Sequence, residues 1–568
     1  MGLSSAVRDP DAAADVIVVG AGPAGATAAT YLARSGVDVL LLEKSTFPRD
    51  KVCGDGLTPR GVKQVLALGV DVSGSDWIKN KGLRVVGAGR SLELPWPVLQ
   101  DFPDFGLVRP RRDFDEMLAT LAVKAGARMR VATSVTAPLR DERTGRITGV
   151  TAKTADGPRE FRAPLVLACD GVSARVALGM GINKRDDRPL GVAVRRYYKS
   201  PSRTDDDYLE SHLELWDRSN PEKAKLLPGY GWIFGLGDGT VNVGLGMLSS
   251  SKAFGKTDYR ALLKTWLDGT PEEWGLREEN AIGSIGGAGL PMGFNRTPHY
   301  SDGLLLVGDA GGAVNPFNGE GIAYAMESAA LAAESVLQAV GRPEGASKEA
   351  ALHGYETAMK DHLGAYYRLG GIFSTLIGKP SIMKTATRLG LPRKDLMYLV
   401  LKLLAGLHDS RDGDWADRVV RSLTRMAPSV WKPSLEKQLL PVEGRDVLSS
   451  YLPIVILLVI VAGFAITMVT VVSDGLGPRR YNRAKLDAYE CGIEPTPLPA
   501  GTAGRFPIKF YLTAMLFIVF DIEIVFLYPW AQSAIPLGVL GLVEIILFIV
   551  TVAVVFAYAW RRGGLDWD

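Results

Sequence analysis

Cysteine and histidine are scarce in this chain of 568 residues, which contains three cysteines and five histidines. The cysteines lie far apart, at Cys53, Cys169 and Cys491, and none belongs to a CxxC pair. The histidines also lack the short spacing that is typical of metal ligands. The sequence therefore favours neither a disulfide framework nor a metal site.

A strong excess of charge is also missing. The net charge is only +3, which disfavours nucleic acid as a partner. The first 15 residues lack the apolar core of a signal peptide, so we expect the part that follows to stay in the cytoplasm. Hydrophobicity is distributed unevenly: the chain has soluble α/β character up to about residue 445, and three long apolar runs follow. This shift indicates a composite protein.

The stretch Asp15–Glu43 has the pattern of a dinucleotide-binding unit. Val16–Val19 is a short β-branched run typical of a buried parallel strand. The next residues form G-x-G-x-x-G, with Gly20, Gly22 and Gly25 as its glycines. They allow a tight turn, close approach of a pyrophosphate, and packing of helix on strand. A second strand, Val37–Leu42, ends at Glu43, which is placed to bind a ribose hydroxyl.

Two later segments return to the same predicted fold. Leu165–Gly171 has the pattern of another buried strand, and Leu304–Val307 precedes Asp309 and a long alanine-rich helix. Between them, residues 191–290 alternate as antiparallel strands do and predict an inserted sheet beside a substrate pocket. We therefore expect a Rossmann-like α/β domain of the glutathione-reductase type, split into residues 1–190 and 291–345.

Other polar residues are less specific. The segment Phe47–Gly61 predicts a cofactor-side loop. Arg111 begins a helix, and it is placed either to reach a phosphate or flavin oxygen or simply to be a solvated charge. Residues 346–433 form a helical region, in which Tyr366–Ile377 and Leu396–Leu407 are apolar. These two runs fit a helical core or a membrane-facing surface that takes up lipid.

The motifs GAGPAG, FPRDKVCGDGLTPR, PGYGWIF, GDGTVNVGLG and GDAGGAVNPFNGEGIAYAMES together resemble the geranylgeranyl reductase family of FAD-dependent oxidoreductases, including members that act on the menaquinone tail. The resemblance covers about Asp15 to Pro433. It implies FAD as cofactor and an elongated apolar pocket. The resemblance implies that FAD is bound by Gly20, Ala21, Gly22, Pro23, Ala24, Gly25, Glu43, Lys44, Cys53, Gly54, Asp55, Gly56, Arg111, Asp309, Gly319, Gly321 and Ile322. It implies that the substrate is bound by Tyr230, Trp232, Asn315, Pro316 and Phe317.

The implied reaction is reduction of an isolated alkene, in which FAD carries the redox chemistry and the protein orients the double bond and excludes water. Cys53, Tyr230 and Trp232 are the expected catalytic residues. Cys53 could donate the proton or be structural, and Tyr230 and Trp232 favour a role as pocket walls. Gly235 stands where the family often has proline, which affects the expected selectivity for tail length or bond position. A flavin monooxygenase of the same fold is the alternative.

After a linker at residues 434–447, residues 448–568 predict an all-α domain of three membrane-spanning helices, at 451–472, 510–530 and 534–560. Carboxylates inside such spans are costly and usually functional. The loop and second span resemble the A subunit of the proton-pumping NADH–quinone oxidoreductase, complex I. That resemblance implies a quinone-side loop with Glu490 and Cys491, and proton-coupling carboxylates at Asp521, Glu523 and Glu544.

The resemblances imply several partners: other complex I subunits, menaquinone or another isoprenoid lipid, membrane lipid, and a transient reductant, either NAD(P)H or an electron carrier. The implied location is the cell membrane, with the flavin part on the cytoplasmic face. The first membrane loop carries six basic residues, and the positive-inside rule therefore places this loop in the cytoplasm. Residue 450, one span earlier, would then lie outside the cell, which conflicts with a cytoplasmic flavin part. We therefore expect two separately working polypeptides, or one reading frame joined from two. Alternatively, the membrane part is a structural subunit that carries a passenger flavin domain.

Overall fold

The computed structural model describes residues 12–218, 222, 225–227, 229–409 and 413–426, together with scattered residues between 514 and 561. The chain divides into two compact units, Met1–Val447 and Leu448–Asp568. We call the first unit the flavin part and the second the membrane part, and each is described by itself.

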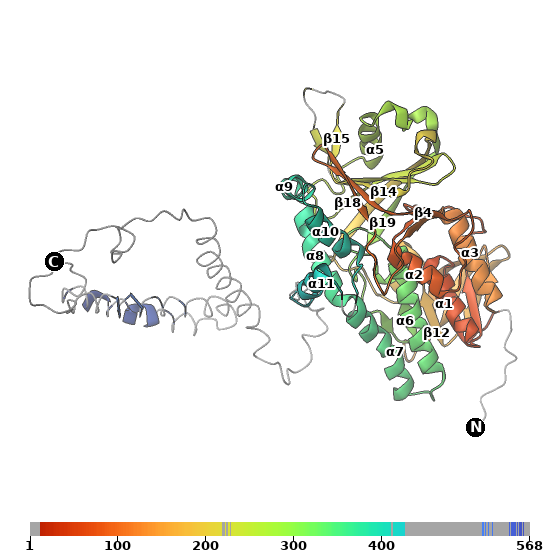
Figure 1. Cartoon of the computed structure of the whole chain (residues 1–568). Helices are drawn as coiled ribbons and strands as arrows, with labels where there is room; N and C mark the ends of the chain where they lie inside the picture. The colour runs from red at the N-terminus through yellow and green to blue at the C-terminus, as the bar shows by residue number, and fades with distance from the viewer. Residues whose placement is uncertain are drawn as a thin grey trace, which may run out of the picture. The chain divides into compact units, whose positions relative to one another are not determined.

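A six-stranded, mainly parallel sheet forms the centre of the flavin part (Figure 1). The glycine-rich unit provides β1 and β2, which pair in parallel over their whole length. The later segments add β12 and β21 in parallel on the other side of β1, as the sequence predicts. In spatial order the strands are β20 (Tyr300–Ser301), β21 (Leu304–Leu306), β12 (Leu165–Ala168), β1 (Val16–Val19), β2 (Val39–Leu42) and β8 (Arg128–Arg130).

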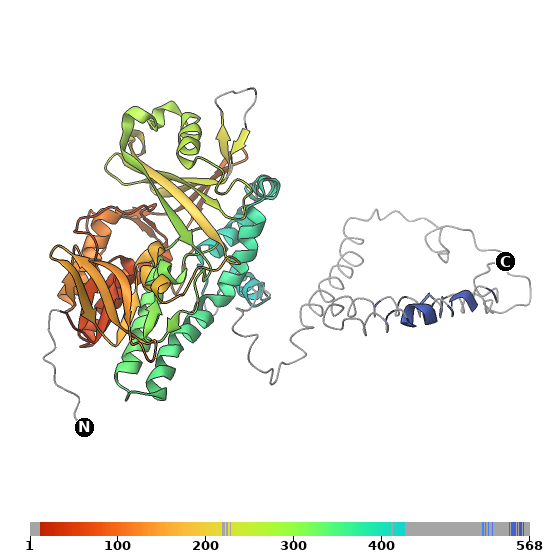
Figure 2. The same ribbon diagram turned by 180° about the vertical axis from the view of Figure 1, so that it is seen from behind.

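Alternating side chains of this sheet pack against two different layers. Val16 and Val18 face a helical layer made of α1 (Pro23–Arg34), α3 (Arg111–Lys124) and α6 (Ile322–Val340). Ile17 and Val19 face a small antiparallel sheet, drawn in orange in Figure 2. Its strands are β9 (Ser134–Arg140), β10 (Ile147–Thr154) and β11 (Gly157–Arg162).

The second large sheet has seven strands and differs from the insertion predicted at 191–290. Two of its strands, β5 and β6, come from residues 82–95, and β5 pairs with β14 in parallel. These two strands join through a tight turn in which Ala88 and Gly89 both have positive φ, although Ala-Gly is not one of the dipeptides typical of such hairpins. In spatial order the strands are β19 (Ala281–Pro291), β13 (Leu190–Lys199), β18 (Thr240–Leu248), β17 (Tyr230–Gly235), β14 (Tyr208–His212), β5 (Gly82–Gly87) and β6 (Arg90–Pro95).

Helices follow α6 up to the end of the described flavin part. The two apolar runs predicted at Tyr366–Ile377 and Leu396–Leu407 fall mainly in α8 and α10. The helices are α7 (Ala346–Met359), α8 (Ala365–Ile377), α9 (Pro380–Gly390), α10 (Lys394–Ala405) and α11 (Trp415–Met426). The remaining elements are α2 (Pro59–Ala67), α4 (Arg175–Gly179), α5 (Tyr259–Asp268), β3 (Gly56–Leu57), β4 (Ile78–Asn80), β7 (Gly106–Val108), β15 (Leu215–Asp217) and β16 (Lys225–Leu227).

Most of the membrane part lies outside the described residues. This applies to the linker at 434–447, the predicted span at 451–472, and Glu490, Cys491, Glu523 and Glu544. Asp521 is described and lies in a helical segment with its side chain exposed. Among the residues that the structure describes, no helix combines the length and apolar character needed to cross a membrane.

Candidate functional site

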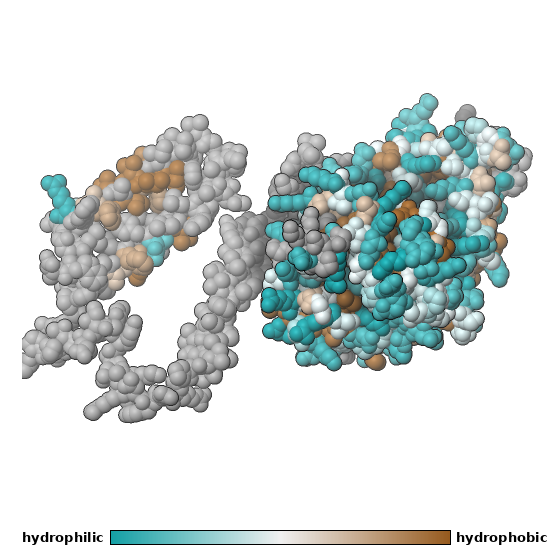
Figure 3. Space-filling model, turned by 90° about the horizontal axis from the view of Figure 1, so that it is seen from above, coloured by the Kyte–Doolittle hydropathy of each residue, from teal (hydrophilic) through white to brown (hydrophobic). Residues whose placement is uncertain are grey.

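A cavity of about 740 Å³ runs through the flavin part. Its polar end lies at the glycine turn after β1, beside the loop at residues 49–58 and the start of α6. Its other end is an apolar arm between the seven-stranded sheet and helices α8 to α10. Seen from above, the coloured face of the flavin part is mainly hydrophilic, with apolar side chains in small patches (Figure 3). The cavity can therefore hold a polar cofactor beside an apolar substrate.

The glycine turn is shaped for close approach of a ligand. Gly20 has φ +98°, a conformation that favours glycine, and a Cβ on Gly25 would overlap the Gly20 carbonyl. A Cβ placed on Gly22 would lie 3.7 Å from a terminal nitrogen of Arg49 and 4.0 Å from one of Arg111. The turn thus leaves a space that two guanidinium groups face, which fits a pyrophosphate.

Asp115 fixes both arginines. Arg111 donates from Nε and Nη2 to the two oxygens of Asp115, at 2.7 and 2.8 Å, and Arg49 approaches the same carboxylate at 2.9 Å. The Asp115 side chain is fully buried, and Arg49 Nη2 also lies 3.4 Å from Glu43 Oε2, so two carboxylates hold the two guanidinium groups at the cavity. Arg111 is therefore a buried residue of the cavity wall beside the glycine turn and not a solvated charge. Arg49 and Asp115 were not among the predicted site residues.

Glu43 lies at the end of β2, against the glycine turn. Its carboxylate accepts hydrogen bonds from the backbone N–H of Ala21 at 2.8 Å and of Ser45 at 3.0 Å. Glu43 and the exposed Lys44 both line the cavity, whereas Ala21 does not. The carboxylate thus ties the glycine turn to the end of β2 and also contacts Arg49, while its contact with a ribose stays a prediction.

The loop after β2 brings Cys53, Gly54 and Gly56 to the cavity wall, but Asp55 points away. Its carboxylate accepts hydrogen bonds from Tyr197 Oη at 2.6 Å, Asn242 Nδ2 at 2.7 Å and the backbone N–H of Arg111 at 3.2 Å. Asp55 therefore anchors the loop to β13, β18 and α3. The structure gives it no contact with the cavity.

The second predicted turn lies where α6 begins. Asp309, Gly319, Gly321 and Ile322 all line the cavity, so the two distant glycine-rich segments meet there as predicted. Burial raises the pKa of Asp309. The start of α6 directs free backbone N–H groups and the positive end of its dipole toward this space. Such an end favours an anionic or electron-rich group of a cofactor.

Only one of the three residues predicted at Asn315–Phe317 reaches the cavity, namely Phe317. Asn315 is completely buried and donates from Nδ2 to Tyr366 Oη at 3.2 Å and to the Leu404 carbonyl at 3.0 Å. It ties the turn to α8 and α10. Pro316 packs near Gly370 of α8 and is not part of the wall.

Tyr230 and Trp232 both line the cavity and both have partners. Tyr230 Oη donates to the Asn318 carbonyl at 3.2 Å, and Trp232 Nε1 donates to Asn242 Oδ1 at 3.1 Å. Burial raises the pKa of Tyr230 to about 12, which makes it a poor acid. Gly244 and Gly246 of β18 face the two rings, where any Cβ would collide with them. The rings therefore fit best as walls.

Cys53 lies at the same wall and is half-buried. Burial raises the pKa of its thiol, and the nearby Arg111 only partly opposes this effect. The thiol is therefore protonated at neutral pH. Its sulfur also accepts a hydrogen bond from the backbone N–H of Asp55 at 3.4 Å, within the loop.

The apolar arm is lined by strand and helix residues that the sequence arguments did not select. From the sheet come Leu83, Val85, Leu94, Trp96, Leu209 and Phe234, and from the helices Met383, Met397, Val400, Leu401 and Leu404. Leu389 and Leu396 line the cavity and are also 54% and 41% exposed, so the arm reaches the surface between α9 and α10. The arm suits a long apolar chain that enters from this end.

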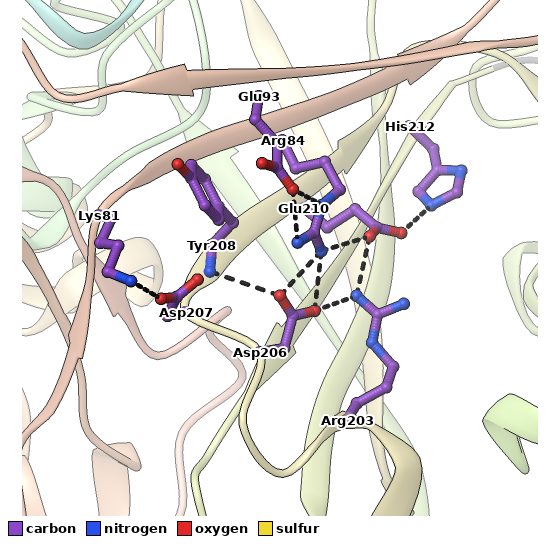
Figure 4. A network of polar contacts seen from close by, with 9 residues as sticks. All are labelled: Lys81, Arg84, Glu93, Arg203, Asp206, Asp207, Tyr208, Glu210 and His212. Carbon is purple, nitrogen blue, oxygen red and sulfur yellow. Dashed lines mark hydrogen bonds and ion pairs between the residues drawn. The ribbon is translucent and has the colours of Figure 1, made fainter.

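A charged network supports the sheet behind the arm (Figure 4). Leu209 and Ser211 of β14 line the cavity, and the alternate residues Glu210 and His212 face the other side. Glu210 accepts from Arg203 at 2.8 Å and from Arg84 at 3.1 Å, and is 2.7 Å from His212 Nε2. Burial opposes ionisation of Glu210, but His212 and the arginines outweigh it and lower its pKa to about 2. The network holds β5 and β14 in register.

Further cavity residues outside the predicted set are Lys51, Asp170 and Glu320. Asp170 Oδ2 accepts from the backbone N–H of Arg175 at 2.6 Å, while its buried Oδ1 has no partner among the described residues. The strand ending in Asp-Gly was a usable signal for this residue. A polar atom left free at this end fits a cofactor that supplies the missing donor.

Comparisons with known proteins divide the chain in the same way. Residues 13–194 match a family described as FAD binding domain, and residues 466–567 match NADH-ubiquinone/plastoquinone oxidoreductase, chain 3. A menaquinone reductase of Mycolicibacterium smegmatis is 36% identical over 409 residues, which are 72% of this chain and 95% of that protein. The A subunit of NADH-quinone oxidoreductase from Mycobacterium bovis is 57% identical over 126 residues, 21% of this chain and 98% of that protein.

Among solved structures, a geranylgeranyl bacteriochlorophyll reductase-like protein from Thermoplasma acidophilum matches with a TM-score of 0.59 and 23% identity. The match covers 72% of this chain and 99% of that one. At this identity it establishes the fold alone. The family match and the geometry of the polar end agree on FAD as the cofactor.

Proposed function

The chain belongs to the menaquinone reductase family in its flavin part and to the family of the NADH-quinone oxidoreductase A subunit in its membrane part, and from this premise we propose that the flavin part saturates double bonds in the isoprenoid tail of menaquinone. The flavin part is an FAD-dependent oxidoreductase. Bound FAD supplies a hydride in such enzymes, and the protein binds and orients the substrate.

One observation carries the substrate assignment: the apolar arm leads from the polar end to the surface. An isoprenoid tail is long, flexible and without hydrogen-bonding groups, so it is best bound by aliphatic and aromatic walls. Those walls are present along the arm from Leu83 to Leu404, and the rings of Tyr230 and Trp232 lie between the arm and the polar end. A double bond in such a tail can therefore be brought beside the flavin while water is excluded.

The mouth of the arm supports uptake from a membrane. Leu376, Leu389 and Leu396 are exposed around it. Between residues 376 and 396 lie five exposed cations, Lys379, Lys384, Arg388, Arg393 and Lys394, and a single acid, Asp395. A surface of leucines and cations is attracted to an anionic bilayer. This arrangement favours the membrane-facing alternative for the region near α9 and α10.

We assign the membrane part the role of a complex I subunit that carries no redox centre itself. Its quinone-side loop would include Glu490 and Cys491, and its proton-coupling carboxylates would be Asp521, Glu523 and Glu544. The proposed partners are the other membrane subunits of that complex. The flavin part would work on the cytoplasmic face, where NAD(P)H or an electron carrier reduces it transiently.

The test uses the purified full chain, loaded with FAD and supplied anaerobically with reductant and menaquinone. We expect products whose tails have gained two hydrogen atoms per saturated bond, as measured by mass spectrometry. Products that instead require oxygen and contain it would establish a monooxygenase and refute the proposal.

A variant pair tests the arm itself. Val400→Trp should fill the arm and slow saturation on the order of 100-fold while FAD stays bound, because the double bond is displaced from the flavin. Val98→Trp is the control, since Val98 is 85% exposed and does not line the cavity. Equal rates for both variants would show that the tail does not use this arm.

A further inference from the structure

Glu320 lies in the cavity wall, apart from the apolar arm and from the clamp of two arginines formed by Arg49 and Arg111 on Asp115. It occupies the turn before α6, between Asn318 and the N-terminal residue Ile322 of that helix. Its Oε1 accepts a hydrogen bond from Thr58 Oγ1 at 2.9 Å. Its Oε2 is buried and has no hydrogen-bond partner among the residues that the structure describes. Glu320 thus lines the cavity with one carboxyl oxygen that no described group satisfies.

A second buried carboxyl nearby has the opposite environment. Glu327, on the same helix α6, accepts from Arg60 Nη2 at 2.8 Å and lies 3.3 Å from His362 Nε2. Burial opposes ionisation of Glu327, but the charge of Arg60 outweighs it and lowers the pKa. For Glu320, burial dominates and raises the pKa to about 7. Two nearby carboxyls with separated pKa values are a common basis for assigning an acid.

Among the described residues, no cation forms an ion pair with Glu320. Arg60 on α2 is paired with Glu327 and donates to the Gly406 carbonyl at 2.8 Å. The remaining titratable groups coupled to Glu320 are Glu327 and Tyr324 on α6 and Tyr366 and Tyr367 on α8. With a pKa of about 7, the carboxyl of Glu320 is protonated in a large fraction of molecules at neutral pH, unlike an ordinary glutamate, and can hold a proton at the cavity wall.

Two other proton-bearing groups at the wall, Tyr230 and Cys53, have partners, whereas Glu320 Oε2 has none among the described residues. Tyr230 already donates its hydroxyl hydrogen to the Asn318 carbonyl. Cys53 lies against Arg111, which is fixed by Asp115. We infer that Glu320 is the catalytic acid of the flavin part and delivers a proton to one carbon of the substrate double bond; this inference rests on the proposed alkene reduction.

The step balances in atoms and charge. Bound, reduced FAD would supply a hydride to one alkene carbon, and Glu320 Oε2 would supply the proton to its neighbour. The π bond breaks as two C–H bonds form, the flavin loses two electrons, and Glu320 is left as a carboxylate. A proton from solvent then restores the acid. Glu320 acts on the substrate directly, so it is a catalytic residue in this scheme.

The experiment uses the full chain with FAD in vesicles and follows a single anaerobic turnover. The flavin is reduced chemically, menaquinone with an unsaturated tail is added, and the saturated product is quantified by mass spectrometry at several pH values. The variants are Glu320→Gln, which keeps the shape and removes the proton, and Glu320→Asp, which keeps the acid. Glu334→Gln is the control, because Glu334 is exposed on the same helix.

We expect Glu320→Gln to slow saturation roughly 100-fold or more, with bound FAD and its visible spectrum unchanged. The saturation rate of the unchanged chain should fall as the pH rises above 7, because Glu320 loses its proton. The midpoint of this fall should be absent in Glu320→Gln and shifted in Glu320→Asp. An unchanged rate and midpoint in Glu320→Gln would overturn the inference. Loss of FAD from both Glu320 variants would also overturn it, by showing a structural role. A lack of saturation by the unchanged chain would instead refute the proposed function.

Discussion

Replacing Arg111 by methionine should weaken FAD binding without unfolding the flavin part. Arg111 faces the glycine turn, where the pyrophosphate is expected, and it lies at the cavity wall. A hydrogen bond to a charged group contributes about 1.5–3 kcal/mol, so its loss should raise the dissociation constant about 10- to 150-fold. Methionine keeps much of the apolar stem of the side chain and so limits the loss of packing.

The cost in stability should be moderate. Removing one partner of a buried ion pair typically costs about 3–5 kcal/mol, because the remaining charge is left alone. Asp115 would still keep Arg49 at 2.9 Å, so we expect a loss of about 1–3 kcal/mol. Arg111→Lys should not restore tight binding, since an ammonium group cannot reproduce both bonds to Asp115.

The assay is a titration of the FAD-free full chain with FAD, followed by quenching of flavin fluorescence. Arg112→Met is the matched control, because Arg112 is the neighbouring residue on α3 and is exposed. It should bind FAD as the unchanged chain does. Binding by Arg111→Met within about threefold of the control, well short of the tenfold expected, would refute the clamp of two arginines.

Three further predictions concern stability and chain integrity. Glu210→Gln should cost about 1.5–3 kcal/mol in urea unfolding, because it removes a buried charge that Arg203, Arg84 and His212 face, while Asp206 still pairs with Arg203. Glu93→Gln, whose carboxylate is half-exposed on Arg84, should cost about 1 kcal/mol or less, and equal costs would contradict the network in Figure 4. Burial lowers the pKa of His299 to about 4 from 6.5, so the unfolded chain binds the proton first as the pH falls. Stability should therefore decline from pH 6.5 to pH 4 and then level, and His299→Gln should remove about 3 kcal/mol of that decline, as measured by urea unfolding at each pH. Immunoblots of the native membrane with antibodies to each end should show two polypeptides, and a single band near 61 kDa with both epitopes would contradict the split.

Much of the cofactor end was predictable because its chemistry depends on local spacing. Gly20 and Gly22 of the first turn, Glu43 after β2 and Asp309 after β21 follow from strand–turn–helix patterns and line the cavity, whereas Gly25 packs against Gly20. The sequence did not decide whether Arg111 binds a ligand or is solvated, because an arginine at the start of a helix is common in both roles. Its partner Asp115 lies four residues on, and this i,i+4 spacing was a usable signal.

The apolar arm was not predictable residue by residue. Its wall combines β5 and β6 with β14, and helices from beyond residue 380, so no local pattern joins them. Asn315 and Asp55 show the converse: both belong to cofactor-like motifs, yet their side chains hold loops to neighbouring elements. A motif fixes the path of the backbone better than the direction of each side chain.

The most direct measurement of the central claim is the saturation state of membrane menaquinone in cells that express the full chain. The control is Gly25→Val, which cannot form the first glycine turn and so cannot hold FAD. We predict tails with added hydrogen only when the unchanged chain is present. Identical menaquinone tails in both strains would contradict the claim that the flavin part reduces them.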